Sequence, residues 1–296
     1  MEEIIVEKEG IRIDIYLANL LNVSRSKIAK NINNILVNDK TVKTSYIVKI
    51  NDIIKINPFE DEIISSSPEK MDLDILYEDD DVIVVNKENG MVVHPAIGAT
   101  HHTLVNGLLY HSNNLSGVNG TFRPGIVHRI DAYTTGLLMV AKNDYAHDFL
   151  SKQLSEKTVY RKYIALVWGV INEDTATINA PIGRDKNDRK KMSVTEVNSK
   201  SAITHLKVLS RYKNATLVEL RLETGRTHQI RVHMNYINHP VVNDPVYGKR
   251  KIIDETGQCL HAKSLGFIHP KTHKYMEFDS ELPECFTNIL NKFKEE

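Results

Sequence analysis

The most constraining stretch of the sequence is GIVHRIDAYTTGLLMVAKN, residues 125–143, in which a charged pair precedes a turn and an apolar run. We predict a strand that ends near Asp131, a Thr/Gly turn at 134–136 and a buried strand over 137–141. Side chains two apart on a strand point to the same face, so Arg129 and Asp131 would share one site. An ionised carboxylate there would face an anionic substrate, although an aspartate before such a turn can also simply cap its own backbone.

Length and composition indicate a globular protein with room for one large domain and one small domain. Hydrophobic residues make up 41% of the 296 residues and charged residues 26%. No run approaches the ~18 apolar residues of a membrane span, and the acidic beginning MEEIIVEKEG is unlike a signal peptide. Cys259 and Cys285 lie far apart, which argues against a disulfide framework and a thiolate zinc site. We expect a cytoplasmic monomer that does not contact a membrane.

The charge is unevenly distributed, although the formal net charge is zero. Residues 21–55 carry seven bases against two acids, whereas residues 60–88 carry eleven acids against two bases. A second basic cluster, RDKNDRKK at 184–191, follows a Pro/Gly break and is either a solvated loop or a nucleic-acid contact. The local excess of bases favours phosphate binding despite the neutral total.

The N-terminal part is predicted to be a small α+β domain followed by an acidic linker. Two short helices are defined by apolar positions at helical spacing: Ile13, Leu17, Leu20 and Leu21 for the first, and Ile28, Ile32 and Ile35 for the second, with Ser24 as its cap. ILVNDKTVK predicts a hairpin at Asn38-Asp39, and SYIVKINDIIKI a strand pair turning at Asn51-Asp52. The Pro-, Ser- and acid-rich stretch before residue 73 predicts a linker, which gives the boundaries 1–58, 59–72 and 73–296.

The remainder of the chain is predicted to be one α+β domain. The segments that read as strands are DVIVVNK, GMVVHP, GIVHRID, GLLMVAK, VYRKYIALVWG, AITHLKVLSRY and ATLVELRLET. Helices are predicted for TLVNGLLYH, residues 144–156, RTHQIRVHMNYIN and residues 284–294. Strands joined by short turns imply a mixed, mainly antiparallel sheet. Alternation along VYRKYIALVWG places Arg161 and Tyr163 on one face of its strand.

Several of these stretches together resemble the RluA-type pseudouridine synthases. HRIDAYTTGLLMVAKN is similar to their HRLDxxTSGLLxxAK signature. DVIVVNKENGMVVHP, KTVYRKYIALVWG, LETGRTHQIRVHM and HPVVNDPVYG resemble further motifs in the same order, with Glu88 where proline is usual and Asn243 where glycine is commoner. The resemblance extends over nearly all of residues 78–286. It implies an RNA pseudouridine synthase that needs no cofactor, and the histidine spacings do not favour a metal.

The resemblance also implies roles for individual side chains. Asp131 would be the catalytic carboxylate, Tyr163 the active-site tyrosine and Arg231 the basic residue that keeps Asp131 ionised through a bidentate contact. The residues expected to contact the substrate RNA around them are His128, Arg129, Thr134 and His228. Outside this motif context, Arg231 would be read as an exposed helix residue and Tyr163 as a core tyrosine.

The implied reaction requires few chemical groups. Pseudouridine forms when the glycosidic bond of a uridine breaks, the uracil turns and rejoins through its fifth carbon, and the proton on that carbon leaves. One carboxylate serves either as nucleophile or as base towards the ribose, and a second group takes part in the late proton transfer. An aromatic ring such as that of Tyr163 would stack on the flipped base, a contact worth roughly 1 to 3 kcal/mol.

Residues 10–57 resemble the small αL RNA-binding domain of ribosomal proteins and RNA-modifying enzymes, with Arg25, Lys27 and Lys30 in or beside its second helix. An αL domain joined to this catalytic domain implies a substrate in large-subunit ribosomal RNA or the assembling large subunit. Two rival hypotheses are a non-catalytic RNA-binding ribosome-assembly factor and a metal-dependent RNA hydrolase. The intact Asp131 motif argues against the first, and the lack of a ligand cluster in the sequence argues against the second.

Overall fold

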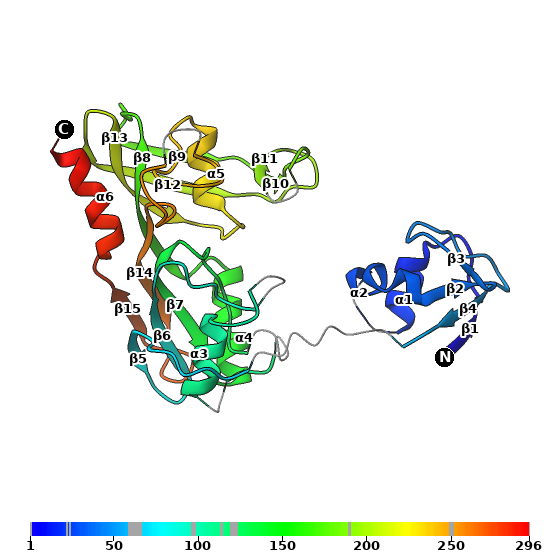
Figure 1. The fold of residues 1–296 in the computed structure, drawn as a ribbon. Helices are drawn as coiled ribbons and strands as arrows, with labels where there is room; N and C mark the ends of the chain where they lie inside the picture. The colour runs from blue at the N-terminus through cyan, green and yellow to red at the C-terminus, as the bar shows by residue number, and fades with distance from the viewer. Residues whose placement is uncertain are drawn as a thin grey trace. The chain divides into compact units, whose positions relative to one another are not determined.

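The computed structural model divides the chain into two compact units, an N-terminal unit of residues 1–63 and a larger unit of residues 64–296, which contains the stretch predicted to be catalytic and is called the catalytic unit below (Figure 1). The predicted linker, residues 59–72, contains the boundary between them. The structure describes residues 2–21, 23, 25–58, 67–95, 99–112, 115–118, 124–188, 191–248 and 252–295. Among these residues, no helix has the length and apolar character needed to cross a membrane.

The N-terminal unit packs short helices against a small antiparallel sheet. Its helices are α1 (Ile13–Leu20), α2 (Arg25–Lys30) and the 3-10 turn η1 (Ile32–Asn34). Its strands are β1 (Glu2–Ile5), β2 (Ile35–Val37), β3 (Lys40–Thr41) and β4 (Ile53–Ile56), in the order β1-β4-β2-β3. Ile13, Leu17, Ile28, Ile35 and Ile54 are fully buried between the two layers.

Two details of the N-terminal prediction are wrong. The second helix ends at Lys30, so Ile35 lies in β2; its predicted cap, Ser24, lies outside the described residues. The predicted strand pair around residues 51 and 52 is absent, because the segment before β4 winds around the buried carboxylate of Asp52. That carboxylate accepts hydrogen bonds from the Lys49 amide and the Tyr46 hydroxyl, both at 2.9 Å. β4 pairs instead with β1 and β2.

The hairpin predicted between β2 and β3 is confirmed. Asn38 and Asp39, its two central residues, have φ angles of 50° and 62°. Val37 pairs with Lys40 on either side of them, as a two-residue hairpin of the I′ type requires. The side chains of asparagine and aspartate tolerate this left-handed conformation better than most, which explains the sequence at the turn.

The catalytic unit is built on a nine-stranded sheet of order β5-β6-β7-β14-β8-β13-β12-β9, with β15 also paired to β14. The strands are β5 (Ile75–Glu78), β6 (Val82–Lys87), β7 (Thr135–Ala141), β8 (Tyr160–Trp168), β9 (Thr175–Asn179), β12 (Ile203–Arg211), β13 (Ala215–Leu222), β14 (Leu260–Ile268) and β15 (Tyr275–Asp279). The pairing of β7 with β14 is parallel and the other pairings in this sheet are antiparallel. The predicted α+β class with a mixed, mainly antiparallel sheet is confirmed.

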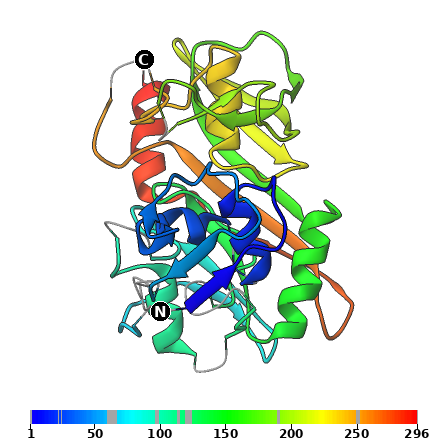
Figure 2. The same cartoon turned by 90° about the vertical axis from the view of Figure 1, so that its right-hand side faces the viewer.

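Helices cover both faces of this sheet. They are α3 (Leu104–His111), α4 (Asp144–Ser155), α5 (Gln229–Tyr236) and α6 (Glu284–Lys294), and a separate hairpin joins β10 (Ile182–Arg184) to β11 (Met192–Val194). Ile164 of β8 packs with α6, whereas Tyr163 lies in the cluster on the opposite face that includes Ile230 of α5. Figure 1 shows α6 and α5 on opposite sides of β8 and β13, and Figure 2 shows β14 (orange) crossing the unit beside β8. The predicted alternation along β8 is therefore confirmed.

The signature stretch differs from its prediction. Residues 125–131, which directly precede the turn, do not form the predicted strand. They make one isolated β-bridge, between Ile126 and Val140. The turn runs from Asp131 to Thr134, and Gly136 already lies within β7. Gly136 has φ 105°, and a Cβ there would collide with the Ala262 carbonyl of β14. The glycine therefore permits the close parallel approach of β14 to β7 rather than forming the turn.

GMVVHP is likewise not a strand. The Val92 and Val93 carbonyls accept hydrogen bonds from Leu104 and Val105 at the start of α3, at 2.9 and 3.0 Å. The segment thus satisfies amides that a helix start leaves without partners.

Candidate active site

Asp131 is presented by a turn that the ends of two strands hold in place. The Asp131 carbonyl accepts the Thr134 amide at 3.0 Å, which closes the turn. Lys87, at the end of β6, donates from Nζ to the Ala132 carbonyl at 2.7 Å, and Gln258, before β14, donates to the Thr134 hydroxyl at 3.1 Å. The backbone is thus fixed while the Asp131 side chain remains 19% exposed.

Arg231 connects this turn to α5. Its Nη1 donates to Oδ2 of Asp131 at 2.8 Å, while Nε and Nη2 form a bidentate pair with Asp244 at 2.7 and 2.8 Å. The Tyr247 ring lies 5.0 Å from the guanidinium carbon. Arg231 is 4% exposed, so the reading as an exposed helix residue is wrong. The bidentate contact predicted for Asp131 is also wrong, because Asp244 occupies the fork of the guanidinium.

The charges in this group stabilise one another. Burial alone would lower the pKa of the Arg231 guanidinium, but the hydrogen bonds and charges of Asp244 and Asp131 outweigh it and raise that pKa. Burial alone would raise the pKa of the Asp244 carboxyl, but Arg231 and the amides of Tyr247 and Val246 lower it. Arg231 and Asp244 therefore stay ionised, and a permanent cation faces Asp131.

His228 lies on the other side of Asp131. It precedes α5 in a left-handed conformation with φ 57°, and its Nε2 is 3.7 Å from Oδ1 of Asp131. Its Nδ1 is 2.8 Å from the Tyr247 hydroxyl, which itself accepts the Met192 amide at 2.9 Å. The hydroxyl can donate its proton to Nδ1, and in that tautomer the ring proton lies on Nε2, facing Asp131. Burial lowers the pKa of His228 and so favours this neutral form.

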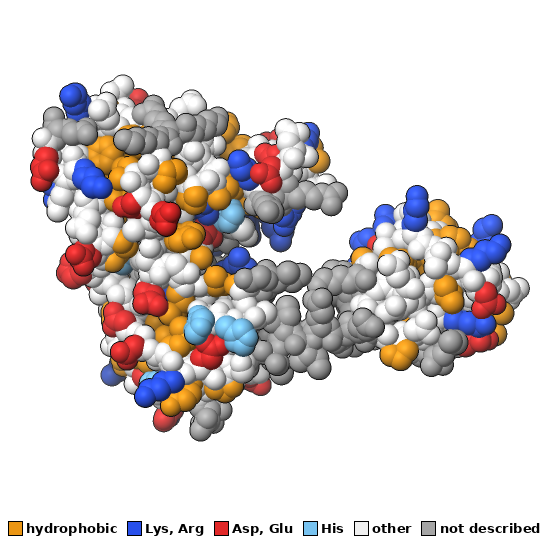
Figure 3. Space-filling view, viewed as in Figure 1, with side chains coloured by type: hydrophobic (Ala, Val, Ile, Leu, Met, Phe, Trp, Pro, Cys, Tyr) orange, Lys and Arg blue, Asp and Glu red, His pale blue; other side chains and the backbone are white. Residues whose placement is uncertain are grey.

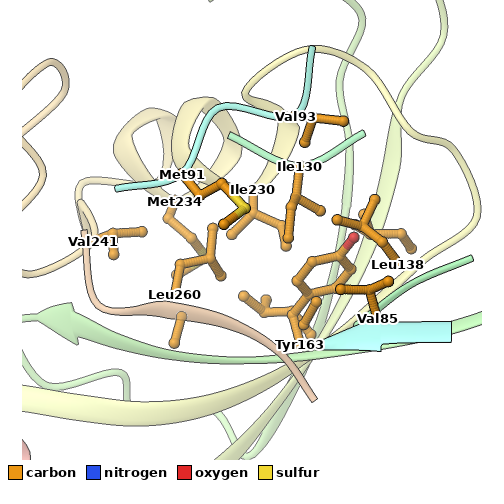
Figure 4. Close-up of a cluster of buried hydrophobic side chains, with 14 of the residues drawn as sticks. Val85, Met91, Val93, Ile130, Leu138, Tyr163, Ile230, Met234, Val241 and Leu260 are labelled. Atoms are coloured by element: carbon orange, nitrogen blue, oxygen red, sulfur yellow. The ribbon is translucent and has the colours of Figure 1, made fainter. Parts of the chain in front are cut away.

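Tyr163 enters the site from β8 through an apolar layer. Figure 4 shows its ring among Val85, Ile130 and Leu138, and the side chain is 7% exposed. Burial raises the pKa of its phenol, with a smaller opposing effect from Arg161, so the hydroxyl keeps its proton at neutral pH. The ring belongs to the core and at the same time lines the pocket.

A pocket of ≈ 470 Å³ brings these groups together. Its wall includes Asp131, Tyr163, His228 and Arg231 from the predicted catalytic set, and the predicted RNA-contact residues His128, Arg129 and Thr134. Residues from the end of α4 and from the loop before α5 complete it. A chamber of this size accommodates one nucleoside, with a carboxylate and an aromatic ring on its wall.

The predicted RNA-contact residues in the catalytic unit differ in their surroundings. Arg129 is exposed and makes no ion pair with Asp131; its Nη1 is 3.5 Å from Nε2 of His94. His128 accepts the Met139 amide of β7 at 3.1 Å, and burial lowers its pKa to about 3. Thr134 is buried in the Asp131 turn. A role for them in binding RNA stays a prediction. Arg129 and Asp131 line the same pocket, as predicted, but they form no ion pair with each other.

Of the predicted RNA contacts in α2, Arg25 is 57% exposed on its side chain and pairs with Asp14 at 2.8 Å. The side chains of Lys27 and Lys30 lie outside the described residues. So do two members of the basic cluster at 184–191, residues 189 and 190.

Sequence reasoning missed the groups that hold the site together. Asp244 and Tyr247 lie within the quoted HPVVNDPVYG stretch, and Lys87 within DVIVVNK, but no role was assigned to them. An acid in a turn just before a proline is the available signal for Asp244, and a lysine that ends an apolar strand is the signal for Lys87. Both signals are common, and only the tertiary contacts give them meaning.

Asp79, Asp81 and His269 form a group with the spacing of metal ligands, since their ligand atoms lie within 4.8 Å of one another. His269 Nδ1 accepts two backbone amides, Lys271 and Thr272, at 3.2 Å. The ring proton must therefore sit on Nε2, which faces Asp79 at 2.8 Å. A nitrogen that carries a proton cannot ligate a metal ion, so this group does not fit one.

Comparisons with known proteins agree with this architecture. The RNA pseudouridylate synthase family matches residues 81–236. The RNA pseudouridine synthase YlyB of Bacillus subtilis is 53% identical over 97% of this chain and 96% of its own length. Ribosomal large subunit pseudouridine synthase D of Neisseria meningitidis serogroup B is 43% identical over 97% of this chain and 79% of its own length. The solved structure of human RNA Pseudouridylate Synthase Domain Containing 1 covers 76% of this chain and 96% of its own, at 26% identity and a TM-score of 0.59.

The fold and the pocket thus define an RNA-modifying isomerase. The chain belongs to the RluA-type RNA pseudouridine synthase family and converts uridine in RNA to pseudouridine.

Proposed function

We propose that Asp131 is the catalytic carboxylate and that it acts on the ribose of a uridine flipped into the pocket. Its Oδ2 is held by Arg231, which leaves Oδ1 as the oxygen that reacts. That oxygen serves either as nucleophile at the glycosidic carbon or as base towards a ribose proton. The single observation that carries the proposal is this partly exposed carboxylate on the wall of a nucleoside-sized pocket, with one oxygen hydrogen-bonded to Arg231 and the other, 3.7 Å from His228, without a hydrogen bond among the described residues.

Tyr163 is proposed to support the detached uracil. Its ring lies on the same wall as Asp131, and stacking worth roughly 1 to 3 kcal/mol offsets much of the cost of flipping the nucleotide. Because burial keeps the phenol protonated, its hydroxyl first donates a hydrogen bond rather than acting as a base. The proton on the fifth carbon leaves after the new carbon–carbon bond has formed; Asp131, by then a carboxylate again, is the base on the same wall that accepts it, directly or through the phenol, which passes its own proton to Asp131 as it takes up the new one.

We further propose that the substrate is large-subunit ribosomal RNA. The Neisseria relative is named for that substrate, and it matches 97% of this chain, including the N-terminal unit. Lys40, Lys43 and Lys49 of that unit are exposed and have no ion-pair partner among the residues that the structure describes. Figure 3 shows Lys and Arg side chains (blue) over the same unit. These lysines supply the phosphate contacts of an RNA-binding domain.

The test uses Asp131→Asn, which keeps the shape of the side chain and removes its charge. We expect pseudouridine formation in a large-subunit RNA fragment to fall below detection, while RNA affinity changes less than about threefold. Asp148→Asn, an exposed change on α4, is the matched control and should keep full activity. Turnover retained in Asp131→Asn would refute the assignment of the carboxylate.

The substrate is tested in cells that lack this protein. We expect pseudouridines to be missing from large-subunit ribosomal RNA, and expression of the intact chain, but not of Asp131→Asn, to restore them. Losses confined to transfer RNA would overturn the substrate while leaving the reaction intact. An unchanged pseudouridine map, with RNA binding present, would favour the non-catalytic assembly factor.

A further inference from the structure

A second buried arginine lies in the wall of the pocket and has no partner among the residues that the structure describes. Arg161 precedes Tyr163 by two residues on β8, lies on the same face and is 7% exposed. Within the described part of the chain, its guanidinium makes no hydrogen bond and no ion pair. Its Nε is fully enclosed and without an acceptor. This arrangement is costly, because a buried charge is ordinarily paired.

The other buried basic side chains of the site show which kind of partner Arg161 lacks. Lys87 donates to two carbonyls, and Arg231 contacts two carboxylates. The charge of Arg161 contributes to lowering the pKa of His128 and opposes the raised pKa of Tyr163, but neither side chain is negatively charged. Among the residues that the structure describes, none provides a counter-charge for Arg161, so an anionic ligand in the pocket would supply it.

The position of the guanidinium suits such a ligand. A Cβ on Gly225 would lie 2.7 Å from Nη1 of Arg161, so the glycine lets the loop before α5 lie close against the guanidinium. The pocket wall includes four arginines, at 129, 161, 226 and 231, and Asp131 as its one carboxylate among the described residues. The field in the pocket therefore attracts anions.

We propose that Arg161 binds the phosphodiester group that adjoins the target uridine. The proposal deepens the activity of this pocket and rests on Asp131 as its catalytic carboxylate. Residues two apart on a strand are about 6.6 Å apart, which is within the span of one nucleotide, so one wall holds both the base and its phosphate. A guanidinium binds a phosphate through two parallel hydrogen bonds, which fixes the sugar between Arg161 and Tyr163 and in front of Asp131.

The test measures coupling between Arg161 and a single phosphate. RNA fragments containing the modified uridine are made with a neutral methylphosphonate at either flanking linkage or at a distant one. With the native protein, we expect a neutral flanking linkage to lower kcat/KM about 10- to 100-fold, mainly through KM, and the distant linkage to have little effect. Arg161→Gln should show a similar loss on natural RNA and less than about threefold further loss with the neutral linkage.

Arg221→Gln, an exposed change on the neighbouring strand β13, is the matched control and should behave as the native protein. Equal losses from the neutral linkage in the native protein and in Arg161→Gln would overturn the proposal, as would no loss in the native protein. If Arg161→Gln does not fold, Arg161→Lys replaces it and should retain part of the coupling. Because Arg161 has no partner in the described part of the chain, the melting temperature of Arg161→Gln should not fall; a large fall would indicate a structural role.

The two proposals fail separately. If Asp131→Asn is inactive and Arg161 shows no coupling to a flanking phosphate, the catalytic role of Asp131 stands and only the phosphate contact of Arg161 is refuted. Full activity of Asp131→Asn would refute the assignment of the active site itself, whatever the result for Arg161.

Discussion

Two walls of the active-site pocket each carry a buried arginine, and the two arginines have opposite surroundings. On the α5 side, Arg231 is bound by Asp244 and Asp131 and lies over Tyr247. On the β8 side, Arg161 is as deeply buried, at 7% exposure against 4%, and has no acceptor among the described residues. The comparison teaches that Arg231, whose charge is paired, positions other protein groups, whereas Arg161 is available to bind a ligand.

The pairing of Arg231 also explains how Asp131 keeps a reactive oxygen. Since Asp244 takes Nε and Nη2, only Nη1 is left for Asp131. A bidentate grip on Asp131 would hold both carboxylate oxygens and weaken their reactivity. Asp244 is therefore a positioning residue that acts through Arg231.

The largest expected effect is a difference in the free energy of unfolding between a variant on the α5 wall and a variant on the β8 wall. Asp244→Asn should lower the free energy of unfolding by about 3 to 5 kcal/mol, because it leaves Arg231 buried with too little counter-charge. Arg161→Met, which removes a cation that has no partner, should change it by less than about 1 kcal/mol or stabilise the protein. Urea unfolding of both variants measures the difference. Similar losses in the two would break the comparison.

Lys87 offers an intermediate case, since its partners are carbonyls rather than carboxylates. Lys87→Met removes the donor from the carbonyls of Glu88 and Ala132. The Asp131 turn should loosen, so kcat should fall while RNA affinity is kept. Lys87→Arg, which keeps a donor, should recover part of kcat; an unchanged kcat in Lys87→Met would show that the turn does not depend on Lys87.

The same residue gives a pH dependence. Burial lowers the pKa of Lys87 from 10.5 to about 7, partly offset by Asp131 and Glu88. Between these values the unfolded chain binds a proton that the folded chain does not, so stability should rise with pH from about 7 to 10.5. This rise should be absent from Lys87→Met when both proteins are unfolded in urea at several pH values. A parallel pH profile for the two would contradict the assignment.

The smallest effects are expected from fully exposed cations. Changing Lys40, Lys43 and Lys49 together to glutamine should leave stability within about 0.5 kcal/mol and lower the salt dependence of RNA binding by up to about one unit of slope per lysine. Turnover at saturating RNA should be unchanged. Titrations at several salt concentrations provide the measurement, and an unchanged slope would argue that the N-terminal unit does not bind phosphates.

The sequence predicted those features that depend on local periodicity. The faces of β8, helices α3 to α6 and the hairpin at Asn38-Asp39 follow from alternation, helical spacing and turn chemistry. The association of Asp131, Tyr163 and Arg231 followed from motif resemblance, and the pocket contains all three.

The sequence could not predict what the neighbours of these residues do. The segment before Asp131 is apolar enough for a strand, but His128 bonds to β7 and Lys87 to the turn, so distant side chains decide its path. Asp244, thirteen residues after Arg231, competes with Asp131 for the Arg231 guanidinium, and no local pattern in the sequence indicates this contact. The missing partner of Arg161 is a property of the folded pocket and leaves no pattern in the sequence.

The position of β14 has a consequence for synthesis of the protein. This strand, residues 260–268, lies between β7 and β8, which come from the middle of the chain. Until the ribosome has released it, β7 and β8 each present an open edge to other chains. The nascent protein therefore passes through an aggregation-prone interval, and a product that stops short of residue 260 cannot close the sheet beneath its own catalytic turn.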